Sequence, residues 1–159
     1  MKRKTSQTVA PFMGRDLKLD YAWGGGFFED ADLHDEKVLD RAGQRDLTVV
    51  EGLDAFTQAI ANRLKTRKGE LAPLGHPDYG SRHHELMGEP NVQRTRDLIK
   101  LYVLQALADE PRIQRVLKAT VRAEHEPPRD TVRIELSVQV IDGPRPLNLV
   151  VPFSLEPHA

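Results

Sequence analysis

The sequence contains no cysteine, so disulfides and thiolate metal sites are excluded, and a reducing compartment is weakly indicated. It also has no excess of one charge. Charged residues make up 30% of the chain, but 23 basic and 24 acidic side chains leave a net charge of -1. No overall field attracts nucleic acid or anionic lipid, so we expect neither as a partner and expect any partner to be recognised locally.

Long apolar segments are also missing. No stretch approaches the roughly 20 apolar residues that cross a bilayer. The opening MKRKTSQTVAPFMG is basic at first, but Thr, Ser, Gln and Pro follow in place of the apolar segment of a signal peptide. These features predict a soluble protein, made in the cytoplasm and without a membrane partner. The length of 159 residues and the hydrophobic content of 39% suit one compact domain.

The first part of the chain has a different composition from the rest. Residues 1–45 combine glycines and acids with little periodicity, which predicts an irregular, partly extended N-terminal arm before a domain at residues 46–159. The alternative is an arm that becomes ordered when Tyr21, Trp23, Phe27 and Phe28 enter a groove on a partner.

Two segments have helical periodicity. Leu53, Phe56, Ile60 and Leu64 recur at the spacing of an amphipathic helix, and Gly69 is a natural stop. A second helix is expected at Val92 to Asp109, with apolar positions over more than half of its circumference. Pro111 ends it, because the residue before a proline resists helical geometry.

The last third of the sequence has the period of strands. Residues 131–141, TVRIELSVQVI, alternate strictly between apolar and polar, and residues 147–155 return as a hairpin partner after the turn DGPRP. A less regular strand is expected near residues 115–124. The predicted fold class is therefore α+β, with two main helices packed on a C-terminal antiparallel β-meander.

Pro152 predicts that the last strand lies at an edge of the sheet or carries a bulge there, because proline cannot donate to a ladder. An edge strand is either protected or used to accept a strand from a partner, and Pro152 is compatible with both.

The segment HPDYGSRHHELMGEPN, residues 76–91, has residue types that occur in metal and catalytic sites. Its candidate metal ligands lack the i, i+4 histidine pair of helical zinc sites, so we expect no metal and no other cofactor. The candidate ligands are His76, Asp78, His83, His84 and Glu85.

Two hydrolytic arrangements can also be drawn from this segment. Glu85 and Glu89, four positions apart, are candidates for the two carboxylates of a glycosidase, but Gly88 and Pro90 disfavour a helix through both. A Ser81, His83 and Asp78 triad lacks a nucleophile elbow. A structural turn is favoured instead, bracketed by Pro77 and Gly80 and anchored by Tyr79.

A resemblance links these segments. KGEL, HPDYGS, GEPN, the helix TRDLIKLYVLQALADEPRI and the closing meander resemble the baseplate wedge family of contractile phage tails, with relatives in type VI secretion baseplates and extracellular injection particles. The similarity runs from about Leu47 to Leu155. Some relatives have carried a lysozyme label, so a peptidoglycan hydrolase is the alternative function.

The resemblance implies a non-enzymatic role in six copies per baseplate. The triplet Glu110, Pro111 and Arg112 would dock on the larger wedge proteins, with the turn His76, Pro77, Asp78, Tyr79 and Gly80 as a structural element or partner contact. The last strand, through Leu147, Leu149, Val151 and Phe153, would receive the first sheath subunits. Tube or hub proteins are further candidate partners. The alternative for Arg112 is that it caps its own helix.

Overall fold

The structure is a computed structural model that describes residues 13–23, 29–37, 43–124, 130–141, 143 and 145–156. The chain divides into two compact units, Met1–Gln58 and Ala59–Ala159. The division falls inside helix α1 (Leu53–Lys65).

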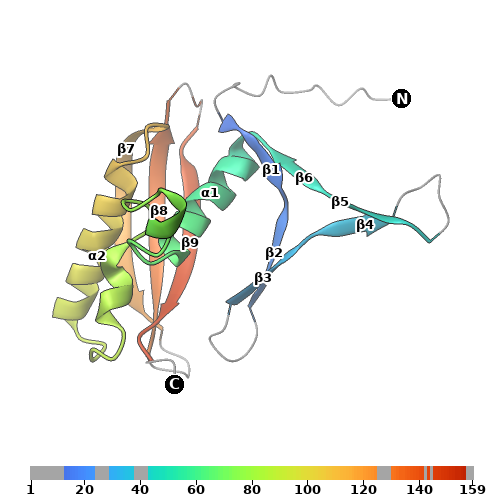
Figure 1. The fold of residues 1–159 in the computed structure, drawn as a ribbon. Coiled ribbons are helices and arrows are strands. Elements are labelled where there is room, and N and C mark those ends of the chain that lie inside the picture. The colour runs from blue at the N-terminus through green and yellow to red at the C-terminus, as the bar shows by residue number, and fades with distance from the viewer. Residues whose placement is uncertain are drawn as a thin grey trace. The chain divides into compact units, whose positions relative to one another are not determined.

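The second unit has the predicted α+β architecture (Figure 1). After α1 come two short 3-10 helices, η2 (Ala72–Leu74) and η3 (Arg82–Leu86), and then α2 (Gln93–Ala108). The strands β7 (Ile113–Ala123), β8 (Thr131–Val140) and β9 (Leu147–Ser154) form an antiparallel sheet in the order β7-β8-β9. The predicted meander and the edge position of the strand with Pro152 are confirmed.

Helix α2 begins after Val92, which has an extended backbone, and ends before Pro111, as expected. Its buried stripe consists of Thr95, Ile99, Val103, Ala106 and Leu107. The predicted apolar face was too wide, because Leu101 is 47% exposed. The helix lies along β7 and η3, and its stripe belongs to the core of this unit.

Strand β8 is the centre of the sheet, and its side chains alternate between the core and the opposite face as predicted. The apolar set of β8 faces the apolar set of β9: Val132 pairs with Phe153, Ile134 with Val151, Leu136 with Leu149, and Val138 with Leu147. This register places one continuous apolar layer on a single face of the sheet.

The first unit contains extended segments, and these segments are paired. Three two-stranded antiparallel ladders are present: β1 (Arg15–Leu17) with β6 (Val49–Glu51), β2 (Leu19–Trp23) with β3 (Glu29–Leu33), and β4 (Asp35–Lys37) with β5 (Arg45–Leu47). The prediction of an irregular arm did not include this pairing. Strands of three to five residues are too short to give a readable period.

The three ladders are joined to one another, and in Figure 1 the strands of this unit form a triangle with one ladder at each corner. Lys18 N–H donates to the Thr48 carbonyl (2.8 Å), His34 N–H donates to the Lys18 carbonyl (2.9 Å), and Thr48 N–H donates to the His34 carbonyl (2.9 Å). These three residues form a closed ring of hydrogen bonds, which we call the three-way junction. Each follows an Asp-Leu pair, so the junction rests on a short internal repeat.

Candidate partner-binding surfaces

The predicted docking triplet lies where α2 turns into β7. Glu110 is 6% exposed, and its carboxylate accepts two hydrogen bonds from the Arg112 guanidinium, Nε to Oε1 at 2.6 Å and Nη2 to Oε2 at 3.0 Å. Pro111 is exposed. The Arg112 guanidinium is therefore held by a carboxylate of its own chain, and Pro111 is the outward member of the triplet.

Arg63 of α1 extends this ion pair into a cluster. Its Nη2 lies 3.7 Å from Glu110 Oε2, and its guanidinium lies over the Tyr79 ring at 4.6 Å. Burial pushes the pKa of Glu110 upward, but hydrogen bonds from Arg112 and the charges of Arg112 and Arg63 outweigh it, so this pKa lies below its ordinary value. Two predicted site segments, the triplet and the turn, are thus joined through Arg63.

The turn His76 to Gly80 has an exposed tip and a buried base. His76, Pro77 and Asp78 are exposed, and Asp78 lies 3.8 Å from Lys68 Nζ. Gly80 is buried with φ +101°, and a Cβ there would lie 2.7 Å from backbone atoms of Thr66 and Arg67. The turn therefore packs directly against the segment that follows α1.

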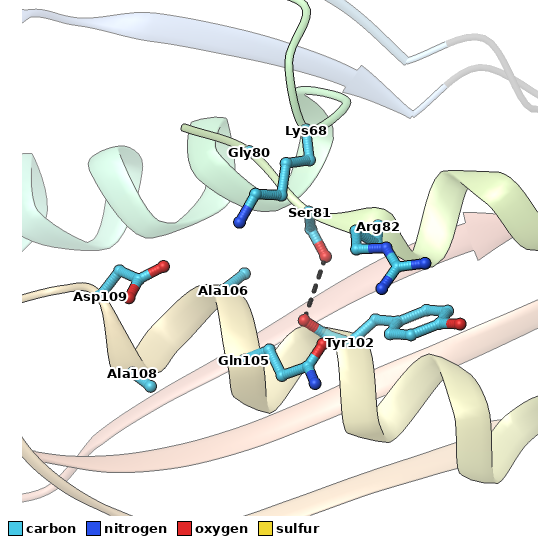
Figure 2. Close-up of a pocket in the computed structure, with 9 residues that line it drawn as sticks. All are labelled: Lys68, Gly80, Ser81, Arg82, Tyr102, Gln105, Ala106, Ala108 and Asp109. Carbon is cyan, nitrogen blue, oxygen red and sulfur yellow. Dashed lines mark hydrogen bonds between the residues drawn. The ribbon is translucent and has the colours of Figure 1, made fainter. Parts of the chain in front are cut away.

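A pocket of about 430 Å³ opens between this segment and α2 (Figure 2). Lys68 and Arg82 reach toward it from one side, while Gln105 and Asp109 line it from the side of α2. Arg82 also stacks over the Tyr102 ring at 4.7 Å and pairs with Glu85. Asp109 of the pocket lining directly precedes the triplet in the chain.

The outer edge of β9 has an unusual composition. The strand LNLVVPFS has no charged residue, and its register with β8 is continuous. Leu155 N–H donates to the Asp130 carbonyl (2.8 Å), which fixes the alternation of the ladder. Residues at odd positions therefore bond to β8, and Asn148, Val150, Pro152 and Ser154 direct their backbone polar groups outward.

The four strand residues predicted to contact a partner are those odd-numbered ones. Val151 and Phe153 are buried, and Leu147 and Leu149 are half-buried on the core face. The structure thus assigns these side chains to the core. The outward groups of the same strand belong to their even-numbered neighbours.

The opposite edge of the sheet differs. Strand β7 has two register irregularities against β8, between Ile113 and Arg115 and between Val116 and Lys118. It also exposes Arg115, Lys118 and Arg122. Bulges and charges are devices that protect an edge strand, so β9 is the more open of the two edges.

The paired histidines lie inside the second unit. The His83 ring stacks on His84 at 4.3 Å and contacts Phe153 edge-on at 4.5 Å, and His84 Nε2 lies 2.8 Å from the Leu64 carbonyl. Burial, with a smaller effect of His84, lowers the pKa of His83 to about 3. The segment of residues 76–91, which we call the histidine loop, thus supports the inner face of β9.

Part of the catalytic triad drawn from the sequence is assembled. His83 Nδ1 lies 2.8 Å from Ser81 Oγ, but Asp78 is exposed beside Lys68. The Ser81 hydroxyl donates to the Tyr102 carbonyl (3.4 Å, Figure 2), so His83 Nδ1–H donates to Oγ. This polarity is opposite to that of a general base.

The carboxylates of this loop are also unsuited to hydrolysis. Glu85 accepts hydrogen bonds from Arg82 at 3.0 and 2.9 Å, which hold its pKa below the ordinary value, whereas a glycosidase acid needs a raised pKa. In the described part of the chain, no three His, Asp or Glu side chains converge on a possible metal position.

Sequence reasoning did not find Arg63 or the three-way junction. The Arg63 to Glu110 contact spans 47 positions of sequence and leaves no local pattern. The junction did have a signal, because Asp-Leu occurs at 16–17, 32–33 and 46–47.

No curated protein sequence matches this chain. A provisionally named tail lysozyme from Geobacter sulfurreducens has 29% sequence identity and a TM-score of 0.58, and the match covers 67% of this chain and 94% of that one. A chain of the baseplate complex from the type VI secretion system has 22% identity and a TM-score of 0.52, covering 66% and 94%, which shows a shared fold.

Among the described residues, no helix is long and apolar enough to cross a membrane. The model of the family described as baseplate wedge protein gp25 matches residues 50–145, which is more than half of the chain and spans α1, the histidine loop, α2, β7 and β8. The chain therefore belongs to the baseplate wedge protein gp25 family.

Proposed function

We propose that this protein is a non-enzymatic baseplate component of a contractile tail or injection device that starts sheath assembly. It is made in the cytoplasm, enters the baseplate in six copies, docks on the larger wedge proteins and receives the first sheath subunits by β-strand addition. Tube or hub proteins are further candidate partners. The open edge of β9 is the observation that carries this proposal.

Strand addition requires a row of free backbone groups in a fixed register. Asn148, Val150 and Ser154 each offer an outward N–H, while Pro152 offers only its carbonyl. The inner side of the strand is held by Phe153 against the two histidines and by the Gly88 N–H, which donates to the Leu155 carbonyl at 2.7 Å. An incoming sheath strand would thus meet a rigid template.

Docking on the wedge proteins is assigned to the surface that contains Pro111 and the pocket beside it. Arg112 and Glu110 fix the backbone on both sides of Pro111, so this proline can be presented in one orientation. The turn His76 to Gly80 supports the same surface through the Tyr79 contact with Arg63.

Peptidoglycan hydrolysis is the second candidate, because a structural relative is provisionally named a tail lysozyme. The lowered pKa of Glu85 and the exposure of Glu89 speak against it. If purified protein cleaves peptidoglycan and Glu85→Gln or Glu89→Gln removes the activity, the structural proposal is wrong.

The sheath role is tested by electron microscopy of particles from cells that lack the gene and carry it back on a plasmid. We expect tubes or baseplates without sheath in the deletion. The intact gene and Val150→Thr, which keeps the outward N–H, should restore sheathed particles. Val150→Pro, which removes that donor and spares the ladder to β8, should not restore them.

Two outcomes would contradict the sheath role. Normally sheathed particles without the gene would exclude an initiating function. Full rescue by Val150→Pro would show that strand addition at β9 is not required.

Docking is tested by capture of tagged protein with the larger wedge proteins. Pro111→Arg should abolish capture while the far-UV circular dichroism spectrum stays unchanged. Leu74→Arg changes another exposed apolar residue, 73% exposed at the end of η2, and should have no effect. Equal capture of both variants would remove the triplet from the docking surface.

A further inference from the structure

The three-way junction has two different faces. Next to the junction, Leu17 pairs with Val49, Leu33 with Leu19, and Leu47 with Asp35. Directly opposed residues of a ladder share a face, and so do residues two positions apart along an extended chain. Five aliphatic side chains therefore lie on one face, which we call the leucine face: Leu17, Leu19, Leu33, Leu47 and Val49.

The leucine face is exposed. Leu17 is 40%, Leu33 49%, Leu47 45% and Val49 38% exposed, and none of the residues between Gly14 and Glu51 whose side chains the structure describes is buried. Two-stranded ladders are marginally stable in water unless another layer covers an apolar face. An aliphatic cluster of this kind marks an interaction surface.

Charge is distributed unequally between the two faces. The pairs one step farther from the junction put five acids on the opposite face, which are Asp16, Asp20, Asp32, Glu36 and Asp46. Lys18 and His34 lie on the same face as these acids, at the junction itself. His34 contacts Asp20 and Glu36. Two copies cannot approach through this acidic face without strong repulsion.

The leucine face also carries charges, but as ion pairs. Asp35 lies among the aliphatic side chains, directly opposite Leu47, and pairs with Arg45, while Arg15 pairs with Glu51 at 2.9 Å farther from the junction. Because these charges are paired within the chain, a second copy meets no strong repulsion here, unlike at the acidic face. Of the two faces of the junction, the leucine face is therefore the one that can pack against a second copy of the chain.

We propose that the leucine faces of two copies pack against each other and form a two-fold contact between the N-terminal units. The contact buries the aliphatic side chains of both junctions in one layer and leaves both acidic faces outward. It uses neither β9 nor the Pro111 surface, so it does not depend on the proposed sheath role.

The association is measured on the purified full-length chain by sedimentation velocity over a range of concentrations. We expect a reversible dimer whose Kd rises at least about tenfold in Leu33→Ser and in Leu47→Ser, because each substitution removes two buried side chains per dimer. The matched control is Leu101→Ser on α2, because Leu101 has a similar exposed fraction of 47%. The dimer Kd of this variant should be unchanged.

A cross-link provides a second readout that does not rely on a polar substitution. The chain has no cysteine, so Leu17→Cys, Leu33→Cys and Leu47→Cys each introduce a single thiol. Mild oxidation should convert at least one of these variants to a disulfide-linked dimer faster than Leu101→Cys.

Three results would overturn the proposal. They are a chain that stays monomeric at every concentration, equal effects of Leu33→Ser and Leu101→Ser on the Kd, and no preferential cross-link at the leucine face. A monomer whose Leu33→Ser variant is missing from particles would assign the face to a different baseplate protein.

Discussion

Gly80 is held by close packing of backbone on backbone. Its φ of +101° disfavours any side chain, and a Cβ would meet the Arg67 carbonyl group and the Thr66 oxygen at 2.7 Å. We expect Gly80→Ala to lower the free energy of unfolding by about 3 kcal/mol, measured by urea denaturation. Gly75→Ala has a similar φ of +88° but open space around it, and should cost only about 1 kcal/mol. Equal costs would show that the close approach is unimportant.

The sequence identified Gly80 as a turn glycine but could not reveal this contact. The proximity arises because the chain returns from the turn alongside the end of α1, where Arg67 and Ser81 form an isolated β-bridge. Turn chemistry is local, whereas the partner of a turn depends on the fold of the segments around it.

His83 makes stability depend on pH near neutrality. Its pKa is about 3 in the folded chain and about 6.5 when unfolded, so the unfolded chain binds more protons between these values. The contribution of His83 to stability is therefore fully present above about pH 6.5 and is lost as the pH falls below that value. Between pH 7 and 5.5 we expect a loss of about 1 kcal/mol that is absent in His83→Asn. His76→Asn, at an exposed histidine, should retain it; urea denaturation at both pH values compares the variants.

Among the elements, β9 makes a prediction that depends on its alternation. Leu149→Pro removes a donor to β8 and should destabilise the chain by about 3 kcal/mol or more, whereas Val150→Pro removes an outward donor and should cost less than about 1 kcal/mol. Thermal unfolding followed by circular dichroism compares them. The reverse order would mean that the outward groups belong to the odd-numbered residues.

Helices and strands of the second unit were predictable because each is long enough for its period to appear. Residues 131–141 alternate strictly, and β8 covers nearly the same range. The strands of the first unit are three to five residues long, and their pairing depends on residues 18, 34 and 48 meeting. In the sequence, the only sign of this pairing is the repeated Asp-Leu pair before residues 18, 34 and 48.

For the molecule as a whole, the buried apolar residues belong almost entirely to one part of the chain. Met13 is the only described buried apolar residue before Ala55. We therefore predict that the domain at residues 46–159 unfolds cooperatively without the first 45 residues, with its Tm within about 5 °C of the full chain. Differential scanning calorimetry of both chains measures this. Loss of the cooperative transition would mean that residues 1–45 are required for the core.

The candidate surfaces were only partly accessible from the sequence. The resemblance pointed to the triplet and the last strand, but the pairing of Glu110 with Arg112 and the inward direction of Phe153 required the fold. Charge gave the least information, because Arg63 lies on α1, far in sequence from Glu110 and Arg112 in the connection between α2 and β7, and approaches Glu110 only in space.

The three-way junction also sets an order of events in time. The ladders β2·β3 and β4·β5 join neighbouring segments and can each zip as a local hairpin within microseconds. The ladder β1·β6 must bring Arg15 to Glu51, across everything between them, and its closure costs more chain entropy. It is therefore the last of the three to form and the first to open, so amide hydrogen exchange of this unit should begin at β1 and β6.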